Sequence, residues 1–254
     1  MEEFVQTTCI LAGYFQEVRV DLTTASAGRR ANGQATVHRQ IRLAGSPLGE
    51  QGHVCALFNS REDEYRLSLP FIKDGFDCGD RAFHLVGSER REDHLRRLRA
   101  AGIDTIEAQK TGQFAMLDWE ETYFGGGYFD PDRWLALLEE VLDSGPRLGF
   151  RLSRVVAHME WALEDRVGID RLIEYEARVN YLWPRYSKSL VGVCTYDLTR
   201  FGGTVIIDVL RTHPLVIVGG VLQQNPFYVP PDQFLQELRE RGGKRTGAAR
   251  APAR

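Results

Sequence analysis

The sequence lacks the features that mark membrane, secreted and zinc-module proteins. No apolar stretch reaches the roughly 18 to 20 residues that a bilayer span needs, and the chain starts Met1-Glu2-Glu3, which is acidic where a signal peptide would be basic. No CxxC pair occurs, so the cysteines indicate neither a zinc module nor a disulfide framework; they are Cys9, Cys55, Cys78 and Cys194. We therefore expect a cytoplasmic protein with reduced thiols and no membrane partner.

Acidic residues are missing from two stretches of the chain. None occurs between Leu22 and Gly49 or between Arg241 and Arg254, and both stretches contain arginines. Because the formal net charge of the 254 residues is still −3, the long middle of the chain must be acidic. Binding to nucleic acid depends on cations that replace counterions at phosphates. An acidic body therefore makes nucleic acid an unexpected partner.

From His53 onward, short apolar runs alternate with longer segments of helical period. This alternation is typical of β-α-β units and a mostly parallel sheet. We expect strands over residues 53–58, 81–86, 105–108, 154–161, 190–196 and 215–222, and a further strand or short helix over residues 4–20. Right-handed crossovers then give an α/β fold, a three-layer sandwich around a mostly parallel central sheet.

Three helices are clearest between the later strands. Asp130 can cap the first, which has Pro131 at its start and ends at Gly145 and Pro146. The second spans residues 170–183, and the third begins near Asp232. We expect three regions: residues 1–50 as an N-terminal extension and linker, residues 51–240 as one domain, and residues 241–254 as a basic disordered tail.

Several motifs of the chain resemble known families. The segment from Phe71 to Val86 is similar to the first helix and second strand of KaiC-like, RecA-fold ATPases. Seven further motifs resemble the MEDS family, a sensory domain named for methanogens, methylotrophs and the regulator DcmR; they are His53-Val-Cys-Ala-Leu-Phe, Tyr128-Phe-Asp-Pro, Met159-Glu-Trp, Tyr175-Glu-Ala-Arg-Val-Asn, Cys194-Thr-Tyr-Asp, Arg211-Thr-His-Pro and Asn225-Pro-Phe-Tyr-Val-Pro-Pro. The resemblance implies a KaiC-like fold, a sensory role in signalling or transcriptional control, and a small hydrocarbon-type ligand.

The stretch that corresponds to a phosphate loop does not suit phosphate. Residues 59–65 contain no glycine and no lysine, although a phosphate loop needs glycine-permitted turns and a lysine. Three consecutive carboxylates, Glu62, Asp63 and Glu64, would instead repel a polyphosphate. At the strand end where such ATPases place a Mg²⁺-linked Asp, the chain has His158, with Glu160 two residues on. We therefore expect a degenerate phosphate loop and no ATP hydrolysis.

A ligand site is expected at the carboxyl ends of the strands, where open α/β sheets bind ligands. We place the first strand beside the strands that end near Glu160 and Asp197, and we expect residues 119–128 to close the pocket, with Gly125-Gly-Gly as a lid. The candidate ligand-binding residues are His53, Cys55, Trp119, Tyr123, Tyr128, His158, Glu160, Cys194, Tyr196, Asp197, Asn225 and Tyr228.

Structural interpretations compete with this assignment. Both buried-strand cysteines and Trp119 also suit a packed core, and the Asn225 loop suits a turn between the last strand and the last helix. Glu160 needs a partner, for which Arg178 or Arg211 are candidates. His213 is interpreted as a helix-end residue that caps carbonyl groups.

No catalytic residue, metal ligand or cofactor is expected. A metal or haem site stays as an alternative, because His53 and Cys55 share one strand face, as do His158 and Glu160, and facing strands can combine such groups.

The leading functional hypothesis is a non-catalytic sensory domain that binds a small molecule or a signalling partner protein, or associates with itself. The alternatives are a nucleotide-binding ATPase with an atypical loop and a pure interaction scaffold.

Overall fold

The computed structural model describes residues 40–49 and 51–248, and the side chains of residues 242–248 are not described. The expected element over residues 4–20 lies outside these ranges. Within the described ranges, no helix is both long and apolar enough to span a membrane.

A seven-stranded sheet forms the centre of the molecule, in the order β5-β4-β6-β7-β3-β8-β9. All neighbouring pairs are parallel except β8 and β9, which form an antiparallel hairpin. A separate two-stranded hairpin, β1 (Arg42–Leu43) and β2 (Ser46–Pro47), precedes it. The seven strands are β3 (His53–Phe58), β4 (Arg81–Val86), β5 (Phe114–Asp118), β6 (Ser153–His158), β7 (Leu190–Asp197), β8 (Leu215–Val218) and β9 (Val221–Gln224).

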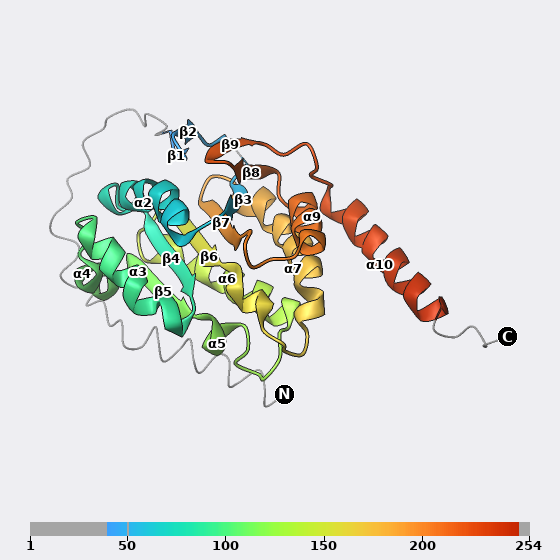
Figure 1. Cartoon of the computed structure of the whole chain (residues 1–254). Coiled ribbons are helices and arrows are strands. Elements are labelled where there is room, and N and C mark those ends of the chain that lie inside the picture. The colour runs from blue at the N-terminus through green and yellow to red at the C-terminus, as the bar shows by residue number, and fades with distance from the viewer. Residues whose placement is uncertain (1–39, 50, 249–254) are drawn as a thin grey trace.

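Helices cover both faces of this sheet (Figure 1). Alternate strand residues divide the core in two, as the two-residue period of a strand requires. One half packs under α2 (Arg61–Asp77), α3 (Ser88–Ala100) and α4 (Thr105–Lys110). The other half packs under α6 (Pro131–Arg147), α7 (Leu172–Val179) and α9 (Gly203–Thr212). The expected three-layer α/β sandwich with a mostly parallel sheet is therefore confirmed.

The remaining helices are short or peripheral. They are α5 (Trp119–Thr122), α8 (Trp183–Tyr186), the 3-10 helices η1 (Met159–Leu163), η2 (Ile169–Arg171) and η3 (Asn180–Leu182), and the long α10 (Pro231–Ala248). The C-terminal part of α10 projects from the body of the molecule (Figure 1). This helix covers the first part of the stretch for which the sequence predicted a disordered tail.

The structure corrects three strand predictions. Residues 105–108 lie in α4, because the Asp104 side chain accepts hydrogen bonds from the amides of Ile106 and Glu107 and so starts a helix. The third strand comes later, at β5. The strand expected over residues 154–161 ends at His158 and continues as η1. The segment 215–222 contains two strands, because Gly219 and Gly220 adopt positive φ and form a hairpin turn.

The helix predictions need smaller corrections. Asp130 caps α6 as expected, but the helix runs through Gly145 and Pro146 to Arg147. The segment 170–183 is broken into η2, α7 and η3, and Pro184 lies in the first turn of α8 instead of ending a helix. Proline suits a first helical turn because the missing N–H has no helical partner there.

Strand β3 passes into α2 almost directly. Only Asn59 and Ser60 connect them, and the Ser60 hydroxyl accepts a hydrogen bond from the amide of Asp63 as the N-cap of α2. The strand neighbours also differ from the expectation: β3 lies between β7 and β8, and β7 separates it from β6. The carboxyl ends of β3, β6 and β7 nevertheless meet at one edge of the sheet.

Candidate functional site

A small pocket lies at this edge of the sheet, with a cavity volume of about 50 Å³. That volume is enough for a few water molecules or a molecule of a few non-hydrogen atoms. The lining residues come from the ends of β3 and β7, the start of α2 and η1; they are Phe58, Ser60, Arg61, Glu64, Glu160, Thr195, Tyr196, Asp197 and Arg200.

A buried ion-pair bridge joins two of the residues that line the pocket, Glu64 and Glu160. Arg90, from α3, donates one hydrogen bond to Glu64 at 2.7 Å and another to Glu160. The side chains are 2%, 7% and 11% exposed, respectively. Burial alone would raise the pKa of Glu64, but His158 and Arg90 outweigh it and lower that pKa to about 2. Glu64 is therefore an ionised carboxylate held inside the fold.

Three buried histidines, His158, His94 and His84, lie next to the Arg90 bridge and extend this polar cluster. Nδ1 of His158 lies 2.6 Å from Glu64 Oε1. His94 lies within hydrogen-bond distance of Tyr65 (2.6 Å) and of His84 (2.8 Å). Burial lowers the pKa of His84 to about 3 and that of His94 well below its usual value. Both imidazoles are therefore neutral near pH 7.

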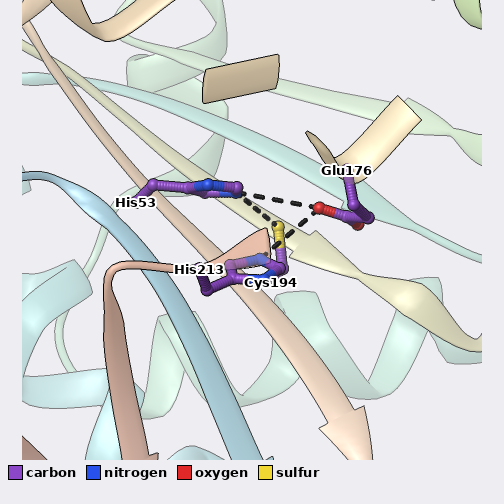
Figure 2. Close-up of side chains that lie close together, drawn as sticks. All are labelled: His53, Glu176, Cys194 and His213. Atoms are coloured by element: carbon purple, nitrogen blue, oxygen red, sulfur yellow. Dashed lines mark hydrogen bonds and ion pairs between the residues drawn. The ribbon is translucent and has the colours of Figure 1, made fainter. Parts of the chain in front are cut away.

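A second buried polar cluster lies on the opposite face of the sheet, under α7 and α9. Figure 2 shows its members, His53, Glu176, Cys194 and His213, which we call the tetrad. One ligand-type atom from each residue lies within 4.8 Å of all the others. Glu176 Oε2 is 3.4 Å from His213 Nε2 and 3.8 Å from His53 Nε2, which is itself 3.8 Å from the Cys194 sulfur.

The surroundings orient the two imidazoles of the tetrad. Asn180 uses its amide nitrogen to donate to three backbone carbonyls, so its Oδ1 is left to accept from His53 Nδ1 at 3.0 Å. His213 Nδ1 donates to the carbonyl of Val209 at 2.9 Å. With both Nδ1 atoms protonated, the Nε2 lone pairs of His53 and His213 face the centre of the tetrad.

Burial sets the protonation of the tetrad. It lowers the pKa of His213 to about 4 and that of His53 well below its usual value. It raises the pKa of Glu176 to about 7, against the hydrogen bond donated by Tyr196 at 2.8 Å. Burial and the nearby Glu176 also raise the pKa of the Cys194 thiol. Burial therefore favours the neutral form of each of the four groups.

The structure divides the expected ligand-binding residues among several places. The strand-end pocket contains Glu160, Tyr196 and Asp197, with His158 directly behind it. Arg90 is the partner of Glu160; the two arginines proposed from the sequence pair elsewhere, with acidic side chains of α6, α7 and α10.

His53 and Cys194 lie away from the strand ends, in the tetrad. Cys55 is buried beside them, since it pairs in register with Cys194 across β3 and β7. The sequence predicted both cysteines at or near the carboxyl edge; each lies inside its strand, three residues before the strand ends.

The other expected residues are outside both clusters. Trp119 and Tyr123 are buried in the core, where the Tyr123 ring stacks on Trp161 at 4.0 Å. Tyr128 is 43% exposed. Asn225 holds the turn before α10, since its amide donates to the carbonyls of Leu210 and His213. Tyr228 lies in the same turn.

Sequence reasoning missed two important residues, Arg90 and Glu176, and assigned only one of two roles to His213. Arg90 has no local sequence signal, because it comes from an exposed-looking, highly charged segment. Glu176 had a signal: it stands four residues after Leu172 on the apolar face of a helix, where a carboxylate needs a buried partner. The helix-capping role expected for His213 is confirmed, because its Nδ1 donates to the Val209 carbonyl. Its Nε2 is directed into the tetrad, which the sequence did not predict.

Comparisons with known proteins identify the family of this chain. A family model described as MEDS, the MEthanogen/methylotroph, DcmR Sensory domain, matches residues 52–214. The chain belongs to the MEDS family. The matched range includes the whole tetrad and every pocket residue. The matched range contains six of the seven motifs, so the family resemblance that they indicated is confirmed; the Asn225 motif lies beyond the matched range.

A curated relative of this MEDS chain is the transcriptional repressor DcmR of Methylorubrum extorquens (strain DSM 6343 / CIP 106787 / DM4). It is 27% identical over 199 residues, which cover 77% of this chain and 71% of the repressor. The family and this relative together support a sensory role in gene regulation for this MEDS chain.

Two solved structures are similar to the MEDS chain in fold. An uncharacterized protein from Pyrococcus horikoshii, in complex with an unknown peptide, has a TM-score of 0.51 at 13% identity and covers 65% of this chain and 76% of its own. A KaiC-like protein from Pyrococcus horikoshii OT3 has a TM-score of 0.46 at 16% identity and covers 65% and 70%. At these identities the likeness concerns the fold alone.

Proposed function

We propose that this chain is a non-catalytic sensory domain that binds a small molecule in the strand-end pocket and transmits that binding to a partner in gene regulation. The observation that carries the proposal is the Arg90 bridge. It supports the proposal because Glu64 lies in the first turn of α2, directly after β3, where a phosphate loop would lead into its helix, and an ionised carboxylate there would repel a phosphate.

The connection between β3 and α2 supports the absence of nucleotide chemistry. A phosphate loop places several consecutive amides around phosphate oxygens, but here only two residues join strand and helix, and Ser60 already caps the helix. The pocket volume of about 50 Å³ is also several-fold below the roughly 300–1,000 Å³ typical of sites for larger ligands.

The pocket walls suit a short molecule with one apolar and one polar end. Phe58 and Tyr196 supply apolar surface, while Arg200 and Thr195 supply hydrogen-bond donors. This composition is compatible with a small hydrocarbon derivative. The domain would have two states, one with the Glu160–Arg90 hydrogen bond formed and one with it broken. A ligand that binds one of these states more tightly would shift the population towards it, as any sensor requires.

Native mass spectrometry and calorimetry test the proposal. The chain, purified without added ligand, is expected to retain or take up a small molecule, and Thr195→Val, which removes only the pocket hydroxyl, should weaken that binding. Arg166→Ala, a surface change, is the matched control. Calorimetry with ATP and Mg²⁺ should show no binding. Sub-millimolar ATP binding, with turnover abolished by Glu160→Gln, would establish an ATPase instead and refute the sensory account.

A further inference from the structure

We propose that the tetrad of His53, Glu176, Cys194 and His213 binds a divalent transition-metal ion, with Zn²⁺ the best match. The site lies on the opposite face of the sheet from the Arg90 bridge, so the inference goes beyond the sensory proposal and does not depend on it.

The ligand types and their spacing fit a single tetrahedral ion. Zinc binds imidazole nitrogen, thiolate and carboxylate oxygen at about 2.0–2.3 Å, which separates neighbouring ligand atoms by about 3.3–3.6 Å in a tetrahedron. Three of the separations in the tetrad are 3.4, 3.8 and 3.8 Å, and all lie within 4.8 Å. Side-chain shifts of about 1 Å would bring these atoms to the spacing of a tetrahedral site. A haem would instead need its axial ligands on opposite sides of a macrocycle, and atoms this close together leave no room for one.

Two buried atoms of the tetrad need a partner. Glu176 Oε2 and His213 Nε2 are fully enclosed, and no hydrogen bond to either is formed within the described residues. A buried polar atom without a partner costs about 1–3 kcal/mol, and more when it carries charge. A cation between these two atoms would satisfy both.

The surrounding hydrogen bonds resemble the outer shell of a metal site. Metal-binding histidines usually donate their second ring nitrogen to a carbonyl or carboxylate, which fixes the tautomer and aims the lone pair. His53 does this through Asn180 and His213 through the Val209 carbonyl. Tyr196 likewise holds the other oxygen of Glu176 and leaves Oε2 directed inward.

Charge balance also favours a divalent ion. One thiolate and one carboxylate neutralise a 2+ charge, and two neutral imidazoles complete the set, so the buried site carries no net charge. The ion would connect β3, β7, α7 and the residue that follows α9, which are far apart in the sequence. Helices α7 and α9 both contact α10, so the ion would hold the surface on which α10 packs.

Metal analysis of the full chain tests this inference. Mass spectrometry of the chain refolded with Zn²⁺ and then desalted should give about one equivalent of zinc. Cys194→Ala should reduce the zinc content at least tenfold. Cys55→Ala is the matched control, because it removes a buried thiol from the adjacent, paired strand but none of the four proposed ligands, and it should keep the metal.

Cobalt provides a readout that does not depend on a variant that folds poorly. The wild-type chain refolded with Co²⁺ should show the near-ultraviolet charge-transfer absorption of a thiolate–cobalt bond and visible bands of tetrahedral intensity. Glu176→Gln, which can still accept the hydrogen bond from Tyr196, should weaken the visible bands. Wild-type protein that takes up neither ion, or Cys194→Ala protein that retains zinc as well as Cys55→Ala, would overturn the proposal and indicate a proton shared between Glu176 and His213. Either result would leave the strand-end pocket and its sensory role unaffected.

Discussion

Replacement of Arg90 by methionine should destabilise the protein strongly. The substitution keeps an unbranched apolar stem but removes the guanidinium, and so leaves Glu64, a carboxylate with only 7% exposure, without its permanently charged partner. Removal of one member of a buried ion pair costs about 3–5 kcal/mol. Glu160 also loses its partner, but it borders the pocket and can be hydrated there, so it should add little to the loss of stability. We therefore expect a loss of about 4 kcal/mol, a large part of the roughly 5–15 kcal/mol that stabilises a domain.

Urea unfolding followed by tryptophan fluorescence measures this loss, because Trp134 and Trp161 are buried. Adding Glu64→Gln to Arg90→Met should recover about 2 kcal/mol or more, since the uncompensated charge is then gone. Arg166→Met breaks an exposed pair with Glu120 and should cost less than about 1 kcal/mol. Additive effects of the two buried substitutions, or an Arg90→Met loss no larger than that of Arg166→Met, would refute the bridge as a coupled unit.

Two further predictions concern acid stability and backbone conformation. His84 and His94 have folded-state pKa values below the usual 6.5, so below pH 6.5 the unfolded chain binds protons that the folded chain does not. Stability should therefore fall with pH from 6.5 down, by up to about 1.4 kcal/mol per pH unit for each histidine, and equal urea midpoints at pH 7.5 and 5.5 would contradict this. Gly168→Ala should cost about 3 kcal/mol or more, because Gly168 has φ +90° and an added Cβ would lie 2.1 Å from the Phe129 carbonyl oxygen. Gly149→Ala, with φ +87° and open space around it, should cost only about 1–2 kcal/mol; equal urea midpoints for the two variants would show that the Phe129 contact is not limiting.

The sequence predicted the centre of the sheet well because buried parallel strands have a strong local signal. The apolar runs at His53–Phe58 and Arg81–Val86 have the bounds that the structure gives. The strand prediction for the segment after Asp104 is wrong, because so short a run of mixed residues fits the two-residue period of a strand as well as the 3.6-residue period of a helix. The side-chain cap at Asp104 stabilises the helix.

The two polar clusters could be predicted only in part. Strand spacing predicted that His53 shares a face with Cys55 and that Cys194 shares a face with Tyr196, because residues two apart on a strand point the same way. It could not bring Glu176 or His213 to them, since these residues come from α7 and from the end of α9. Such a meeting depends on how helices cross the sheet, which no local pattern encodes. Arg90 was missed for the same reason.

The short junction between β3 and α2 limits how this domain can respond to a signal. With two residues between strand and helix, this junction has no loop that could order or close over a bound molecule. A displacement at the junction would instead tilt the start of α2 about Ser60. Because α2 contacts β1, that tilt would reach the β1–β2 hairpin, so an event at the edge of the sheet would be read at the N-terminal side of the domain.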